Sequence, residues 1–179
     1  MISLNALFWL LVVLFAIVGA MRGWAKELLV SFSVILAIFI ITVLEKYVPF
    51  VRDTLAFQQS TGLFWLRVGI MVALVFFGYQ TPYFPRLAST NRFVSDKFQD
   101  TLLGVFLGAI NGYLIFGTIW YWLHELNYPF SIITAPVPGT AMGDAALKII
   151  PFLAPHWLGT PVIFFAVGIA FVFVLVVFI

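Results

Sequence analysis

Long uninterrupted runs of apolar residues alternate with shorter polar segments along the chain. Five such runs cover about residues 4–20, 28–44, 63–80, 101–123 and 161–179. Each is close to the length of about 20 residues that an α-helix needs to cross a bilayer, where an unpaired backbone is too costly to tolerate. The pattern predicts an all-α fold, a polytopic transmembrane helix bundle with a four-helix core plus a fifth C-terminal span. Four spans and a re-entrant segment are the alternative.

The segment between the fourth and fifth runs, residues 124–160, is the most irregular part of the chain. Its helix breakers are Pro129, Pro136, Pro138, Pro151 and Pro155. Within it, residues 141–150 predict a short helix, with Asp144 and Lys148 spaced i,i+4 on one face. We predict that this segment lies at the membrane interface and that residues 1–179 form a single transmembrane domain.

Composition narrows the partners that the chain is expected to bind. The sequence is 64% hydrophobic and 9% charged, whereas soluble domains are about a quarter charged. The absence of cysteine excludes disulfides and thiolate metal sites. A net charge of +2, carried by scattered basic residues, argues against nucleic-acid binding. The expected partners are the lipid bilayer and other membrane-protein subunits, or a second copy of the chain.

The fourth run carries glycine at every fourth position. Gly104, Gly108 and Gly112 therefore share one face of the predicted helix, and that face has no side chains. Such a face lets another helix approach closely, which is how helices in lipid gain van der Waals contact. Asn111 beside it needs a polar partner away from lipid. We predict that this face is a helix-packing surface.

A basic stretch follows the first run and contains Gly19, Arg22, Gly23, Lys26 and Glu27. We interpret it as a tight turn at the cytoplasmic surface, where positive charge is favoured. A second basic connection, after the third run, carries further positive residues on the same side. The first run itself is interpreted as a retained span.

The distribution of basic residues predicts the orientation. The connections after the first and third runs contain Arg22, Lys26, Arg86, Arg92 and Lys97, whereas the connections after the second and fourth contain Lys46, Arg52 and Lys148. This bias places the N-terminus outside and the C-terminus inside. Arg22 and Asp100 then lie at the same membrane edge, and we predict an ion pair between them. A simple cap by Asp100 at the N-terminus of its own helix, the fourth run, is the alternative.

Two of these stretches together are similar to a known family. Residues 19–27, with an apolar-Gly pair, Arg22-Gly23 and then Lys26-Glu27, resemble the signature after the first span of the CvpA family, the colicin V production proteins of bacterial membranes. The segment from Asp100 through its three glycines resembles the family's Asp-x-x-x-Gly and glycine ladder. The likeness covers roughly residues 4–123. It departs from the family at Thr101 and Asn111, where basic residues are common.

The resemblance implies a bacterial inner-membrane protein linked to colicin V production or secretion and to envelope homeostasis, with no known catalytic residues. The chain's own residues point the same way. His124 and His156 lie at predicted membrane edges, where an interfacial role is favoured over a cofactor ligand. No catalytic site, metal or cofactor is expected, although a bound lipid or pigment stays open.

Transport would require ionisable groups deep within the spans. Arg67 lies one turn inside the third run and is expected to extend to the headgroups; otherwise it pairs inside the bundle with Asp53 or Glu125. We therefore favour a non-enzymatic structural or accessory subunit that acts through helix packing. A small transporter or channel component is the alternative.

Overall fold

The computed structural model describes residues 3–56, 61–80 and 97–178. Within these ranges the regular secondary structure is entirely helical, which confirms the predicted all-α fold. The α-helices are α1 (Leu4–Arg22), α2 (Trp24–Tyr47), α3 (Thr61–Tyr79), α5 (Lys97–Glu125), α6 (Ala141–Ile149), α7 (Ala154–Trp157) and α8 (Val162–Phe178). A π-helical segment, η1 (Phe50–Ala56), follows α2, and a 3-10 turn, η3 (Ile150–Phe152), follows α6. Arg86 and Arg92, which contributed to the predicted orientation, lie outside the described residues.

Four of these helices, α1, α2, α3 and α5, are long and apolar enough to cross a membrane. A fifth span results only if α6–α7 and α8 are counted as one span, and this pair is bent by 67°. The structure is therefore a helical membrane bundle with four to five candidate spans.

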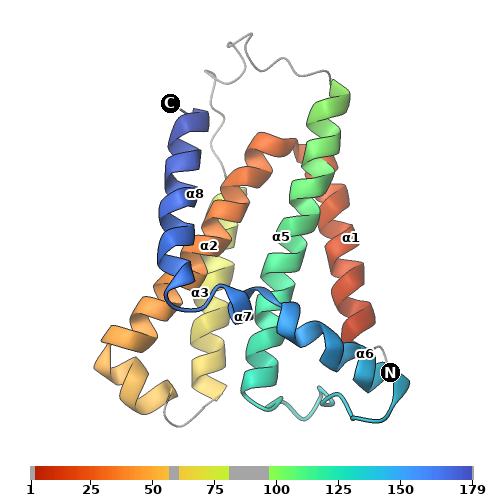
Figure 1. Cartoon of the computed structure of the whole chain (residues 1–179), viewed down its shortest axis with the longest axis vertical. Helices are drawn as coiled ribbons and strands as arrows, with labels where there is room; N and C mark the ends of the chain where they lie inside the picture. The colour runs from red at the N-terminus through yellow and green to blue at the C-terminus, as the bar shows by residue number, and fades with distance from the viewer. Residues whose placement is uncertain (1–2, 57–60, 81–96, 179) are drawn as a thin grey trace.

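The long helices run alternately up and down, with α1 and α5 side by side in opposite directions (Figure 1). We call the end that holds Arg22, Tyr79 and Lys97 the upper end, and the end that holds Thr61 and Glu125 the lower end. α2 is the central helix, because it contacts α1, α3, α5 and α8. Its inward residues Val30, Val34 and Ala37 are completely buried. The two ends of the chain lie at opposite ends of the bundle (Figure 1).

The turn between α1 and α2 is much shorter than predicted. Only Gly23 lies between the two helices. Its backbone has φ 84° and ψ 157°, a conformation that residues other than glycine rarely adopt. The other residues of the predicted turn belong to helices. In lipid, a helix satisfies its own backbone, so both helices extend to the single glycine that can reverse the chain.

The predicted short helix in the proline-rich segment is present as α6. Its N-terminus is capped by Thr140, whose hydroxyl accepts a hydrogen bond from the Gly143 amide at 3.1 Å, and Asp144 accepts one from the Gly139 amide at 2.9 Å. Lys148 is exposed. The following residues dock on the bundle, since the Tyr113 hydroxyl of α5 donates to the carbonyl of Phe152 and Leu153 is completely buried.

Candidate functional site: two polar clusters inside the bundle

The glycines of α5 lie directly against the backbone of α1. A Cβ added at Gly108 would lie 2.9 Å from the Cα of Gly19 and would overlap the carbonyl oxygen of Phe15. One added at Gly104 would overlap the carbonyl oxygen of Gly19, and one at Gly112 would lie 2.9 Å from the Cβ of Phe15. The structure thus places all three predicted packing glycines in one seam. Gly19, predicted only as part of a turn, is the α1 side of that seam.

Just beside this seam lies the upper cluster, which consists of Arg22, Glu27, Ser31, Tyr79 and Asn111. Its centre is the carboxylate of Glu27, which is completely buried. Arg22 Nη1 donates to Glu27 Oε1 at 2.8 Å, and Asn111 Nδ2 donates to Oε2 at 2.8 Å. The Tyr79 hydroxyl lies 3.5 Å from the same Oε2. Donors from α1, α3 and α5 therefore converge on one carboxylate of α2.

Further contacts tie the same residues to the backbone. Arg22 Nη2 donates to the carbonyl of Tyr79 at 3.1 Å, and the guanidinium carbon lies 4.2 Å from the centre of the Tyr79 ring. Asn111 Nδ2 also donates to the Glu27 carbonyl at 2.9 Å, while its Oδ1 accepts from Ser31 at 2.6 Å. Asn111 thus has the buried polar partners that its place in an apolar run requires.

The predicted ion pair between Arg22 and Asp100 is not formed. Within the described residues Arg22 pairs with Glu27, because a buried carboxylate left without a cation would be very costly. Asp100 instead accepts a hydrogen bond from the Trp24 amide at 3.1 Å and lies against Gly23. It therefore caps the N-terminus of α2, whose positive dipole end favours an anion, and not that of its own helix as predicted, because α5 begins three residues earlier, at Lys97. Lys26 is exposed at the same end.

The lower cluster consists of Arg67 of α3, Glu45 of α2 and Glu125 of α5. Arg67 is 5% exposed. Its Nε and Nη2 donate to the two oxygens of Glu45 at 2.6 and 3.1 Å, and its Nη1 donates to Glu125 at 2.7 Å. The guanidinium carbon lies 5.8 Å from the centre of the Trp122 ring. One cation is thus enclosed by two carboxylates and an aromatic ring.

This arrangement corrects the interpretation of Arg67. The side chain does not extend to the headgroups, because two carboxylates on neighbouring helices meet it inside the bundle. Of the two partners named from the sequence, Glu125 pairs with Arg67, whereas Asp53 pairs with its neighbour Arg52 at 2.6 Å. Glu45, the bidentate partner, was not identified.

The two histidines both lie beside tyrosines. His124 Nδ1 is 3.4 Å from the Tyr128 hydroxyl, and the ring of His156 lies 6.4 Å from that of Tyr121, centre to centre. Within the described ranges, no group of three or more His, Cys, Asp or Glu side chains is arranged to hold a metal ion.

A sequence signal for the two clusters does exist on α5. Asn111, Thr118 and Glu125 recur every seven residues, which is two helical turns, so they share one face. Thr118 lies between the clusters and is completely buried, and its hydroxyl has no hydrogen-bond partner among the described residues. Polar residues repeated at this spacing in an otherwise apolar helix would have indicated that this face of α5 is turned to the bundle interior.

The clusters can hold charge inside the bundle and fix how the helices meet. In both, each charged group is within hydrogen-bond distance of an opposite charge on another helix, or across the turn that joins α1 and α2. No protein-family model matches the chain, and no curated protein or solved structure matches it. The resemblance to the colicin V production proteins therefore stays a prediction.

Proposed function

We propose that this chain is a non-enzymatic subunit of a bacterial inner-membrane assembly, similar in role to the colicin V production proteins. In this proposal it acts as a rigid helical scaffold that binds a larger membrane complex concerned with secretion or envelope homeostasis. The function is exerted through helix packing and not through a reaction.

The observation that carries the proposal is that the buried charges bind other residues of the bundle. Glu27 and Arg67 are each bound by partners from neighbouring helices, so their charges hold the bundle together. The outward faces are apolar instead. Leu10, Val13 and Ile17 form an exposed stripe on α1, and most of α8 is exposed as well. A rigid interior with apolar outer faces suits a subunit that binds neighbouring helices in lipid.

A small transporter or channel component is the second candidate. It is favoured by one observation: Glu27 is an ionisable group that is completely buried among four candidate spans. Intramembrane carboxylates commonly serve proton or ion pathways. In the upper cluster, however, Arg22 and Asn111 already bind both oxygens of this carboxylate. The scaffold therefore remains the preferred proposal.

The proposed orientation places the upper end in the cytoplasm. Arg22, Lys26 and Lys97 lie together at that end, as this orientation requires, and the excess of basic residues over the other end depends on Arg86 and Arg92, outside the described residues. Because the chain contains no cysteine, single cysteines can test it. A cysteine at exposed Gln99 should be protected from an impermeant maleimide added outside intact cells, and one at exposed Thr54 should be labelled. The opposite pattern would invert the orientation.

The function is tested by extracting the protein from its native membrane in a mild detergent and analysing it by native gel and mass spectrometry. Stoichiometric co-migration with other membrane proteins is expected. A solitary homo-oligomer would contradict the scaffold proposal. In that case, ion flux should be measured in proteoliposomes with the wild type and with Glu27→Gln, and a flux that Glu27→Gln abolishes would establish the second candidate.

A further inference from the structure

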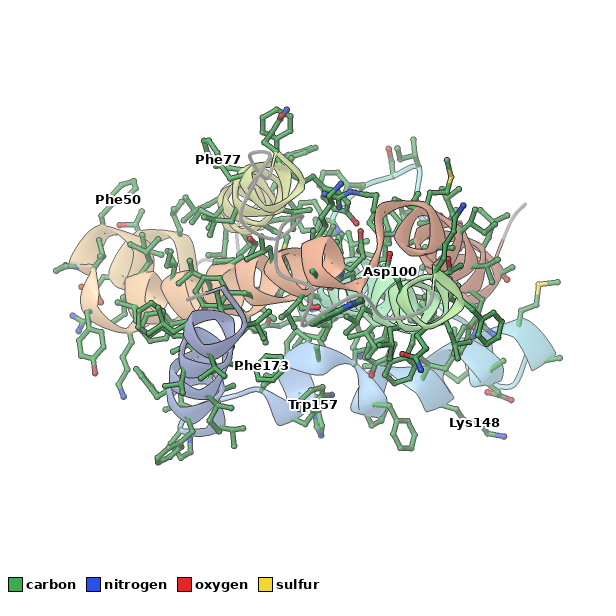
Figure 2. The ribbon with its side chains drawn as sticks, turned by 90° about the horizontal axis from the view of Figure 1, so that it is seen from above. Phe50, Phe77, Asp100, Lys148, Trp157 and Phe173 are labelled. Atoms are coloured by element: carbon green, nitrogen blue, oxygen red, sulfur yellow. The ribbon has the colours of Figure 1, made fainter. Side chains whose placement is uncertain are left out.

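A cavity of about 340 Å³ lies between α8 and the rest of the bundle. Residues of α2, α5, α7 and α8 line it, among them Ser31, Leu114, Trp157, Ala170 and Phe173. Figure 2 shows Phe173 on α8 and Trp157 on α7 on the same side of α2. On another part of its surface, α8 is held to α2 by ring contacts, Phe39 with Phe164 at 5.6 Å and Phe32 with Phe171 at 6.4 Å.

The wall of this cavity offers no free hydrogen-bond donor to a polar ligand. Eleven of the twelve residues that line it are apolar or aromatic, and the twelfth is Ser31. The Ser31 hydroxyl donates to Asn111 at 2.6 Å, and the indole N–H of Trp157 donates to the carbonyl of Phe152 at 3.1 Å. Apolar cavities do not retain water, but they do bind apolar molecules. The chemistry therefore selects a hydrocarbon.

The size and direction of the cavity favour a single hydrocarbon chain as the ligand. Its lining on α8 extends from Ala166 to Val174, which is about 12 Å along the helix axis. A helix is about 10 Å across with its side chains, so a neighbouring helix could place only side chains in this space, whereas an extended hydrocarbon chain can lie within it along α8. A lipid acyl chain is narrow and lies along the membrane normal, as α8 does if it spans the bilayer. Towards the lower end, Trp157 and Leu158 line the cavity where α7 precedes the start of α8.

We propose that this cavity binds one acyl chain of a bilayer phospholipid, whose headgroup lies at the upper end. The bound chain fills the space between α8 and Leu114 of α5, and it completes the attachment of α8 to the four-helix core. This inference does not depend on the proposed scaffold role.

Two tryptophan substitutions on α8 test the proposal. Ala170→Trp fills the cavity, whereas Val172→Trp adds the same side chain at a position that is 59% exposed and does not line the cavity. After purification in mild detergent, native mass spectrometry should show one phospholipid retained by the wild type and by Val172→Trp, and its loss in Ala170→Trp. Phospholipid added to delipidated protein should raise the melting temperature of the first two but not of Ala170→Trp.

Gel filtration checks that each variant is folded. If Ala170→Trp is aggregated, the smaller Ala166→Leu serves instead, with a partial loss of the lipid-bound species expected. A wild type that retains no lipid, equal retention by the cavity-filling and control variants, or a polypeptide in place of the lipid would each overturn the proposal.

Discussion

The upper and lower clusters each enclose a buried charge among partners from neighbouring helices, but the two buried charges have opposite signs. In the upper cluster a carboxylate, Glu27, is enclosed by donors, and its exposed fraction is 0%. In the lower cluster a guanidinium, Arg67, is enclosed by two carboxylates whose side chains are 25% and 45% exposed. The upper carboxylate is thus completely buried and its cation, Arg22, is 20% exposed, whereas both carboxylates that bind the lower guanidinium are more exposed than that.

The comparison indicates where each cluster derives its stability. An ion pair removed from water stabilises a fold only when its geometry and its remaining hydrogen bonds are nearly complete. Glu27 meets this condition because α1 and α5 approach backbone to backbone at Gly19 and Gly104, near Arg22 and Asn111. In the lower cluster, carboxylates from α2 and α5 meet instead on the long side chain of Arg67 from α3.

The largest effect is expected from removing the buried carboxylate. Glu27→Leu leaves Arg22 without its carboxylate and Asn111 without one acceptor, and it should cost about 3 to 5 kcal/mol of unfolding free energy. The matched control is Glu45→Leu on the same helix, since Arg67 keeps Glu125. Thermal unfolding in mild detergent measures both. Equal losses would remove the distinction between the clusters.

The next effect tests whether the glycine seam shapes the upper cluster. Gly108→Ala places a Cβ against the backbone of Phe15 and Gly19, which cannot give way as a flexible side chain does. We expect a loss of about 1 to 3 kcal/mol from this overpacking. Gly69→Ala on α3 is the control, because a Cβ there meets no atom within 4 Å. If both variants are equally stable, the seam is not tightly packed.

The positions of the helices and the glycine seam followed from the sequence because both depend on local patterns. Apolar length predicts a span, and three glycines at i, i+4, i+8 predict a smooth face whatever lies opposite. The partner of that face could not be predicted. Gly19 seemed to belong to a turn, and only the continuation of α1 through Arg22 places it against Gly104.

The charged clusters were harder to predict, since pairing depends on the register between helices distant in the chain. Glu27 was assigned to a turn because the second run was taken to begin at residue 28. With α2 beginning at Trp24, Glu27 lies three residues before buried Val30 on the inward face. Glu45 likewise lay just beyond the second run, which was taken to end at residue 44, although α2 continues to Tyr47.

A smaller effect is expected at Asp100, which separates capping from ion pairing at the upper end. Asp100→Ala removes the acceptor of the Trp24 amide and should cost about 1 kcal/mol, whereas Asp100→Asn keeps an acceptor and should retain most of the stability. Exchanging the charges, with Arg22→Asp and Asp100→Arg together, should not restore stability, because Arg22 is bound to Glu27. Recovery in the double variant would instead show that the two residues meet.

The smallest effects are expected from single substitutions in the lower cluster. Glu125→Gln should cost less than about 1 kcal/mol, because its side chain is 45% exposed and makes one hydrogen bond with Arg67. Glu45→Gln should cost somewhat more, since Glu45 binds Arg67 with both oxygens and is less exposed.

The informative variant is the double substitution of both glutamates, measured by the same thermal unfolding. Each single variant leaves Arg67 one carboxylate, but the double variant leaves a buried guanidinium with none. Its loss should therefore exceed the sum of the two single losses, because residues that share one partner are not independent. An additive result would mean that Arg67 reaches water when its carboxylates are removed. The lower cluster would then be an interfacial ion pair, and only the upper cluster would hold charge inside the bundle.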